Sequence, residues 1–358
     1  MRSSIISASL ALVATVAAIP QELPKVNLES IPKLPLNIFA ETPKFKEPVP
    51  FEVAKEKFRN ATGSDAEVKR EAITDSHLSA RATCSNVRVR TEWDSYSDSD
   101  RQAFVDAIKC LMGRGPSGQF SQSKSRYEDL VALHQTLTPN VHGSDKFLIW
   151  HRYLTWTFED MLRSECGFNR NMPWFDETRY AGKFAQSSIF SDKWFGGIAL
   201  GGNCVTTGQF ANLAINVGPG SGNQLHCLAR AGDGSKTANC NAAYVNQCNA
   251  FSDFHGMADC AEGGPHAWGH NGIGAVMQDV YASPADPVFW LHHAFIDRNF
   301  RIWQNANSAR TTSISGNDKA GNALTLDTTV NVYDMRPTVR IRDILDTTGT
   351  TLCYKYNY

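Results

Sequence analysis

Apolar positions recur at helical spacing along several stretches in the middle of the chain. In "SDRQAFVDAIKCLM" the apolar residues fall on one side, and Ser99, with Gln102 three residues later, predicts the N-cap. "RYEDLVALHQTL" repeats the pattern. "SDKFLIWHRYLTWTFEDMLRSECG" predicts a third helix from Ser144 to about Gly167, because glycine favours the left-handed conformation that ends helices.

A fourth helix is predicted in "SPADPVFWLHHAFIDR", with Ser283 as N-cap and Pro284 in the first turn. Two adjacent histidines, His292 and His293, lie in its apolar part. Either one fits an inward-facing stripe of helical spacing, so periodicity alone does not choose between them.

The remaining regions carry weaker periodicity. Residues 196–264 are rich in glycine, asparagine and alanine and hold five cysteines, which predicts long disulfide-tied loops. Residues 311–358 contain alternating segments such as "TVRIR" and "LCYKYNY", which predict short strands. The chain is therefore expected to be mainly α-helical.

The N-terminal region differs from the rest of the chain. Residues 1–18 have a cation, a short apolar stretch and a small-residue end, which predicts a secretory signal peptide that is too short to span a bilayer. Residues 19–81 carry no cysteine and many prolines, and a dibasic pair precedes Glu71. We interpret them as a pro-segment or N-terminal extension, and 82–358 as the folded domain.

Charge and cysteine content narrow the class of protein. The 35 basic and 36 acidic residues give a net charge of -1, so no overall field attracts nucleic acid or anionic lipid. Neither is expected as a partner. Nine cysteines fit a secreted, disulfide-bonded protein, and the odd number leaves at least one thiol unpaired within the chain.

The distribution of the ten histidines suggests a metal-binding site. Two groups lie on faces predicted to be buried: His134, His142 and His151, then His266 and His270 in "PHAWGHNGIG" with the later pair His292 and His293. A single buried histidine is usually a structural residue with a satisfied hydrogen bond, but six would each need a partner. Two sets of three imidazoles without a carboxylate favour copper over catalytic zinc or non-haem iron.

Two long motifs make the sequence resemble the tyrosinase, catechol oxidase and hemocyanin family of coupled binuclear (type 3) copper proteins, specifically the short secreted fungal polyphenol oxidases. They are "HGSDKFLIWHRYLTWTFE", in which Thr155 replaces the usual leucine or methionine, and "DPVFWLHHAFID". With "VRVRTEW" and the terminal "CYKYNY", the resemblance covers about 84–358. It implies a tyrosinase-like domain whose central four-helix bundle holds a dicopper site.

The resemblance also implies a ligand set and a reaction. Copper A is then held by His134, His142 and His151, and copper B by His266, His270 and His293. The family uses O2 as co-substrate to oxidise o-diphenols (catechols) to o-quinones, so small phenols are the expected partners. Asp297, one turn after His293, is a candidate to orient that ligand or to form an ion pair within the bundle.

Further positions bear on substrate choice through the same resemblance. Glu262, four residues before His266, matches a glutamate that holds a water, or else it is an ordinary loop carboxylate. Ala267 stands where efficient tyrosinases have asparagine, while Asn271 offers an amide after His270. We therefore expect diphenolase activity with weak hydroxylation of small monophenols. Val280 is expected over copper A, and His292 near the substrate pocket or bonded to backbone.

Three other functions remain open at this stage. An o-aminophenol oxidase or a tailoring oxidase of secondary metabolism would share every ligand. A hemocyanin-like oxygen carrier would use the same site without admitting phenols, and a zinc hydrolase would use His266 and His270 with one metal. The oligomeric state is not predicted. Because the chain ends at its tyrosine motif, any latency is expected to come from 19–81.

Overall fold

The computed structural model describes residues 34, 36 and 84–358. The predicted signal peptide and nearly all of the predicted pro-segment lie outside them. Among the described residues, none of the helices is both long and apolar enough to cross a membrane.

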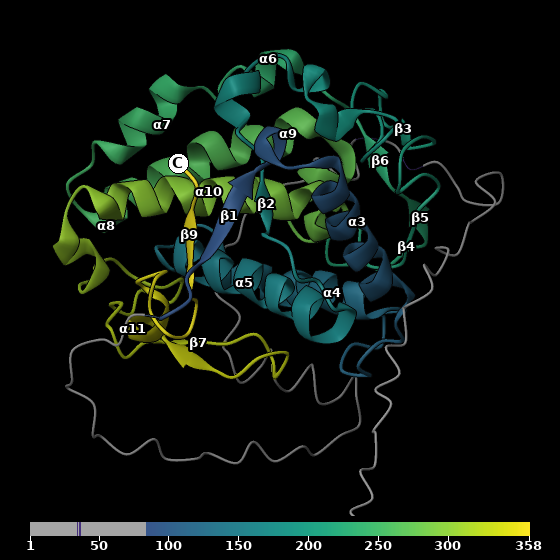
Figure 1. Ribbon diagram of the computed structural model, residues 1–358. Helices are drawn as coiled ribbons and strands as arrows, with labels where there is room; N and C mark the ends of the chain where they lie inside the picture. The colour runs from purple at the N-terminus through teal and green to yellow at the C-terminus, as the bar shows by residue number, and fades with distance from the viewer. Residues whose placement is uncertain (1–33, 35, 37–83) are drawn as a thin grey trace, which may run out of the picture.

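The described chain is mainly helical, as predicted, and its long helices lie at the centre (Figure 1). The α-helices are α3 (Asp98–Gly113), α4 (Arg126–Val141), α5 (Lys146–Cys166), α6 (Gly234–Thr237), α7 (Ala242–Asn249), α8 (Phe254–Ala261), α9 (Ala267–Ile273), α10 (Val288–Asn305) and α11 (Ile341–Ile344). A π-helical turn, η6 (Glu262–His266), joins α8 to α9. The 3-10 turns are η2 (Trp93–Ser95), η3 (Glu177–Tyr180), η4 (Phe184–Gln186), η5 (Ser188–Phe190), η7 (Ala275–Gln278), η8 (Ser283–Ala285) and η9 (Ser308–Thr311).

The strands are short, as predicted for residues 311–358, and others form outside that region. They are β1 (Arg88–Glu92), β2 (Pro173–Trp174), β3 (Asn203–Cys204), β4 (Ala214–Ile215), β5 (His226–Cys227), β6 (Ala229–Arg230), β7 (Thr329–Val330), β8 (Val339–Arg340) and β9 (Tyr354–Tyr356). The largest sheet is parallel in the order β2-β1-β9, with Arg88 opposite Tyr354. Figure 1 shows β1 and β9 side by side across the helices, and the Cys84–Cys353 disulfide closes the same junction.

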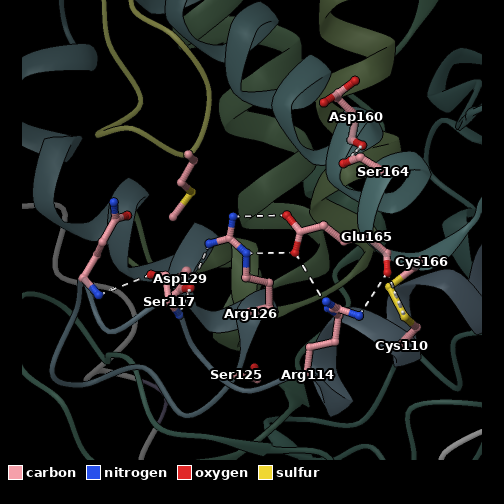
Figure 2. A network of polar contacts seen from close by, with 12 residues as sticks. Cys110, Arg114, Ser117, Ser125, Arg126, Asp129, Asp160, Ser164, Glu165 and Cys166 are labelled. Atoms are coloured by element: carbon pink, nitrogen blue, oxygen red, sulfur yellow. Dashed lines mark hydrogen bonds and ion pairs between the residues drawn. A yellow bond between two sulfur atoms is a disulfide. The ribbon is translucent and has the colours of Figure 1, made fainter. Parts of the chain in front are cut away.

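Helices α4, α5, α9 and α10 form the central bundle, in which α5 and α10 cross the middle of the molecule one above the other (Figure 1). The ends of α3, α4 and α5 are tied together by the Cys110–Cys166 disulfide and by Arg126, which contacts Glu165 at 2.9 Å and Asp129 at 3.0 Å (Figure 2). These ties fix the two helices that carry the first histidines.

Two predicted helix starts are wrong. The N-cap of α3 is Ser97, whose hydroxyl accepts the Asp100 N–H, because "SDSD" offers two capping serines and the earlier one has an acidic residue three positions later. Ser283 begins the separate turn η8, and α10 starts after Pro287, which fits the first turn of a helix. The end of α5 at Gly167, with φ of 67°, is as predicted.

The region 196–264 is tied by disulfides, as predicted, through Cys204–Cys227 and Cys248–Cys260. It is not only loop, because α7 and α8 form there, each eight residues long and capped by a side chain. Such short helices show too few apolar repeats to be recognised by periodicity. Cys240 is buried and is the one cysteine without a disulfide, which agrees with the odd number.

Candidate metal centre

The first histidine group consists of His134 on α4, His142 directly after α4, and His151 on α5. One ring nitrogen from each lies within 4.8 Å of the others. All three side chains are buried, with at most 5% of each residue exposed. The three histidines span 18 positions of the sequence. Helical spacing and the turn at Gly143, with φ of 61°, bring them together.

Backbone carbonyls fix the orientation of each ring in this group. The Nδ1 atoms of His134, His142 and His151 lie 2.7, 3.2 and 2.9 Å from carbonyl oxygens of Tyr281, Thr138 and Phe147. A carbonyl only accepts hydrogen bonds, so each Nδ1 carries the proton and each Nε2 presents a lone pair. The Nε2 atoms of His134 and His151 face one another at 3.3 Å.

The second histidine group is built on shorter elements. His266 ends η6, His270 lies on α9, and His292 and His293 lie on α10, with ligand atoms again within 4.8 Å. Carbonyl oxygens of Glu262 and Met277 fix Nδ1 of His266 and His270 at 3.0 and 2.6 Å. The Nε2 atoms of His270 and His293 face one another at 3.1 Å, and Nε2 of His266 is buried without a partner.

Both groups have the donor chemistry that copper requires. Burial is the main cause that lowers the pKa of these histidines, to about 4 for His142, so the rings are neutral at neutral pH. Two bare Nε2 lone pairs at van der Waals distance repel one another unless a cation lies between them. Within the described residues neither group includes a carboxylate or thiolate, and an all-imidazole set fits copper.

Apolar rings separate the two groups while keeping them adjacent. Phe147 lies 4.6 Å from the His151 ring and 4.5 Å from the His266 ring, between centroids. Phe289 lies 4.0 Å from His293 and 5.4 Å from His134. His151 and His293 stack at 4.7 Å, so ions held by the two groups would be neighbours.

The candidate substrate residues Glu262, Ala267, Asn271 and Val280, called the rim residues below, are all half-buried. Glu262 Oε1 accepts the N–H of Gly143, next to His142, at 2.7 Å, and burial raises the pKa of Glu262 to about 8. This carboxyl therefore lies between the two groups. Asn271 donates its amide N–H to the carbonyl of Ala267 at 2.8 Å, and the carbonyl of Val280 lies 3.4 Å from the Thr138 hydroxyl.

The two remaining predicted residues are fully enclosed. His292 is 0% exposed and its Nδ1 lies 2.6 Å from Oε1 of Glu177. Asp297 accepts from Arg152 at 2.5 Å and from the hydroxyls of Tyr354 and Tyr356, and it does not contact His293 in any hydrogen bond of the described chain. Of the two roles considered for Asp297, the structure shows the ion pair.

Sequence reasoning missed Glu177. It lies in "MPWFDET", 89 positions before His266, in a segment without helical period. Burial raises its pKa well above the usual range. The only signal in the sequence is an acidic residue that follows an apolar stretch, and this signal is too common to single it out.

A helical bundle that places two histidine groups side by side is the arrangement expected of a protein with a binuclear metal centre. A family model for the common central domain of tyrosinase matches residues 124–306, just over half of the chain. The match spans the helices that carry both histidine groups. The chain belongs to the tyrosinase family.

Its relatives are fungal oxidases. Tyrosinase P of Aspergillus terreus is 28% identical over 330 residues, covering 76% of this chain and 93% of the relative. Tyrosinase ustQ of Aspergillus flavus is 30% identical over 298 residues, covering 76% and 80%. N-acetyl-6-hydroxytryptophan oxidase ivoB of Emericella nidulans is 27% identical over 338 residues, covering 76% and 92%.

Solved structures agree with the fold. A polyphenol oxidase variant from Thermothelomyces thermophila superposes with a TM-score of 0.71 at 26% identity, covering 88% of this chain and 99% of the other. A functional unit of Octopus hemocyanin has a TM-score of 0.52 at 19% identity, covering 76% and 68%, which is a likeness of fold alone. The chain is therefore an oxidoreductase of the tyrosinase family.

Proposed function

We propose that this protein is a secreted dicopper oxidase that oxidises o-diphenols to o-quinones with O2. The observation that carries the proposal is the pair of adjacent histidine groups in which backbone carbonyls fix five Nδ1 atoms and Nε2 atoms face one another. Bound copper supplies O2 binding and electron transfer. Reduction of one O2 to two waters takes four electrons and four protons, which two o-diphenols provide.

This geometry supports the following assignment of ligands. The first group would hold copper A, and His266, His270 and His293 would hold copper B. His293 is assigned as the third ligand of this group in place of His292, because the Nε2 atom of His293 faces that of His270 at 3.1 Å. Phe147 and Phe289 keep water from the space between the rings, where electrostatic interactions are strengthened.

The rim favours diphenol oxidation over monophenol hydroxylation. Hydroxylation requires removal of a phenolic proton, and Glu262 is the one candidate base among the rim residues. Ala267 has no polar side chain with which to hold a water beside it, and one amide N–H of Asn271 bonds the Ala267 carbonyl, which fixes that side chain against its own helix. We therefore expect weak hydroxylation, limited to small phenols.

A second candidate is an oxidase of an aminophenol or of an aromatic secondary metabolite. The name of the relative N-acetyl-6-hydroxytryptophan oxidase supports it, since that protein is named for a hydroxylated tryptophan derivative. A reversible oxygen carrier has only the fold likeness to hemocyanin in its favour.

Four disulfides support secretion, because such bonds persist in oxidising compartments. We further propose that residues 1–18 are a signal peptide and that 19–81 are removed or restrain the domain. Trimming after Arg70 or Arg81 should then raise turnover, and equal turnover of precursor and trimmed protein would contradict the restraint.

The deciding experiment combines metal analysis with substrate profiling of copper-loaded, trimmed protein. We expect two coppers per chain and steady O2 uptake with catechol. Uptake with o-aminophenol or N-acetyl-6-hydroxytryptophan but not catechol would favour the second candidate. Reversible O2 binding without turnover would indicate the carrier, and a single zinc would overturn all three.

A further inference from the structure

Glu177 is a buried carboxylate next to the second histidine group, and the reaction does not use it. It is the first residue of η3, is 0% exposed, and its Oε1 lies 2.6 Å from Nδ1 of His292. Its own segment is fixed to α10, because the Phe175 N–H donates to the carbonyl of Leu291 at 3.3 Å. A buried polar group of this kind is costly unless its partners hold it in place.

Three neighbours of the Glu177 side chain share one property: each is, or contacts, the residue directly before a histidine of the second group. His292 precedes His293. An alanine methyl at Gly269, which precedes His270, would lie 3.0 Å from Oε2 of Glu177 and 2.5 Å from Cε1 of His292. Burial raises the pKa of the Glu177 carboxyl, and the neighbouring Cys240 thiol lowers it in part. The Sγ of Cys240 lies 3.7 Å from the carbonyl oxygen of Pro265, which precedes His266.

The second histidine group needs support that the first does not. The first lies on helices of 16 and 21 residues. His266 follows a π-helical turn with Gly263, Gly264 and Pro265, and Gly264 has non-helical φ and ψ of -100° and -113°. His270 lies on a helix of only seven residues, too short to be stable by itself.

We propose that Glu177 is a positioning residue for copper B, acting through His292, Gly269 and Cys240 on the backbone beside each of its three ligands. The inference rests on the proposed function, since it presumes that this group holds copper. Loss of Glu177 should allow the three rings to separate, while the copper A ligands, which Glu177 does not touch, keep their geometry.

The test compares copper retention in holoenzyme variants. Glu177→Ala removes the carboxylate, and Glu177→Gln keeps an oxygen that can accept from His292. Glu128→Ala is the matched control, because Glu128 is a buried carboxylate on α4 that bonds Asn216 and the Lys124 N–H and does not contact the second group. Copper per chain is measured during dialysis against a chelator, together with the paramagnetic resonance signal of isolated Cu(II).

We expect Glu177→Ala to lose one of two coppers at least tenfold faster than the parent and to develop the signal of a single, uncoupled Cu(II). Glu177→Gln should retain both, and Glu128→Ala should retain both even if its melting temperature falls. Equal retention in Glu177→Ala and parent would overturn the proposal, as would loss of both coppers at one rate. A parent that never binds two coppers would instead refute the proposed function.

A milder variant covers the case in which Glu177→Ala does not fold. Gly269→Ala keeps every polar group but inserts a methyl between Glu177, His292 and α9. It should show the same selective loss of one copper. Retention equal to that of the parent would also contradict the role of this contact.

Discussion

Replacing Asp297 should unfold the protein more readily without removing any copper ligand. Asp297 is 4% exposed and accepts from Arg152, Tyr354 and Tyr356, while Arg90 lies 3.5 Å away. It therefore joins β1, α5, α10 and β9. Arg90 keeps a second counter-ion, Glu159, at 3.0 Å, but within the described residues Arg152 has no other carboxylate.

The magnitude follows from the charge left behind. Asp297→Ala leaves the fully buried guanidinium of Arg152 without a counter-ion, and removing one partner of a buried ion pair costs about 3–5 kcal/mol. Native proteins have only about 5–15 kcal/mol of unfolding free energy, so this is a large share. With a denaturant slope of about 3 kcal/mol per M urea, the midpoint should fall by about 1 M or more.

The assay is urea unfolding followed by tryptophan fluorescence, with disulfides intact. The control is Asp327→Ala, because Asp327 also contacts two arginines, Arg340 at 3.1 Å and Arg342 at 2.6 Å, but its side chain is 60% exposed. Exposed pairs contribute about 0–1 kcal/mol. Equal midpoints for Asp297→Ala and Asp327→Ala would refute the reasoning.

The pH dependence of the Asp297 effect has a definite sign. Burial by itself would raise the pKa of Asp297, but Arg152 and Arg90 lower it below the usual range. A lowered folded pKa contributes stability above the unfolded value, about 3.9, and this contribution is lost as pH falls through the folded value. The difference between Asp297→Asn and the parent should therefore be constant near neutrality and shrink in strong acid.

Three further predictions concern the site and its surroundings. His293→Ala should hold one copper even in excess copper, whereas His292→Ala should regain the second copper in excess. Metal analysis at two copper concentrations checks this. The reverse result would mean that His292, not His293, is the ligand. Ala267→Asn should raise the ratio of monophenol to diphenol turnover, measured by O2 uptake, and an unchanged ratio would exclude this position as a determinant. Asp145 lies 2.7 Å from His255 and raises the pKa of that exposed imidazole. His255→Gln should therefore destabilise the protein by ~0.2–1 kcal/mol below about pH 6.5, and not at all well above the raised pKa. Thermal melts at pH 5.5 and 9 check this.

Helices with a long apolar stripe were easier to predict than the single residues at which helices begin. Helix α5 and its C-terminal end were predictable, since its apolar stripe runs for several turns and Gly167 ends it, although the helix begins at Lys146 and not at the predicted Ser144. The start of α3 was not, because Ser97 and Ser99 both precede acidic or amide residues at the capping distance. Only the backbone decides which serine adopts the extended conformation, and it is Ser97, with φ of -67° and ψ of 155°.

The six histidines were predictable as candidates because each lies within a long motif or on a predicted inner face. Their orientation was not. The carbonyl that holds His270 belongs to Met277, in the 3-10 turn η7. The carbonyl that holds His134 belongs to Tyr281, in the loop after η7. These contacts depend on where the chain from η7 to η8 lies against α4 and α9, which no local pattern encodes.

The two halves of the candidate centre lie on elements of different length and regularity. In the first, His142 and His151 bond carbonyls four residues earlier on helices of 16 and 21 residues, so long helices orient these two rings. His266 of the second half also bonds a carbonyl four residues earlier, but within a π-helical turn. In the second, the element that supplies His266 and His270 is a glycine-rich turn and a two-turn helix. Its geometry must come from outside, and Glu177 is in contact with it from a distant segment. A ligand pattern therefore reveals where copper would bind, whereas the residue that holds the weaker half together becomes visible only when the chain is folded.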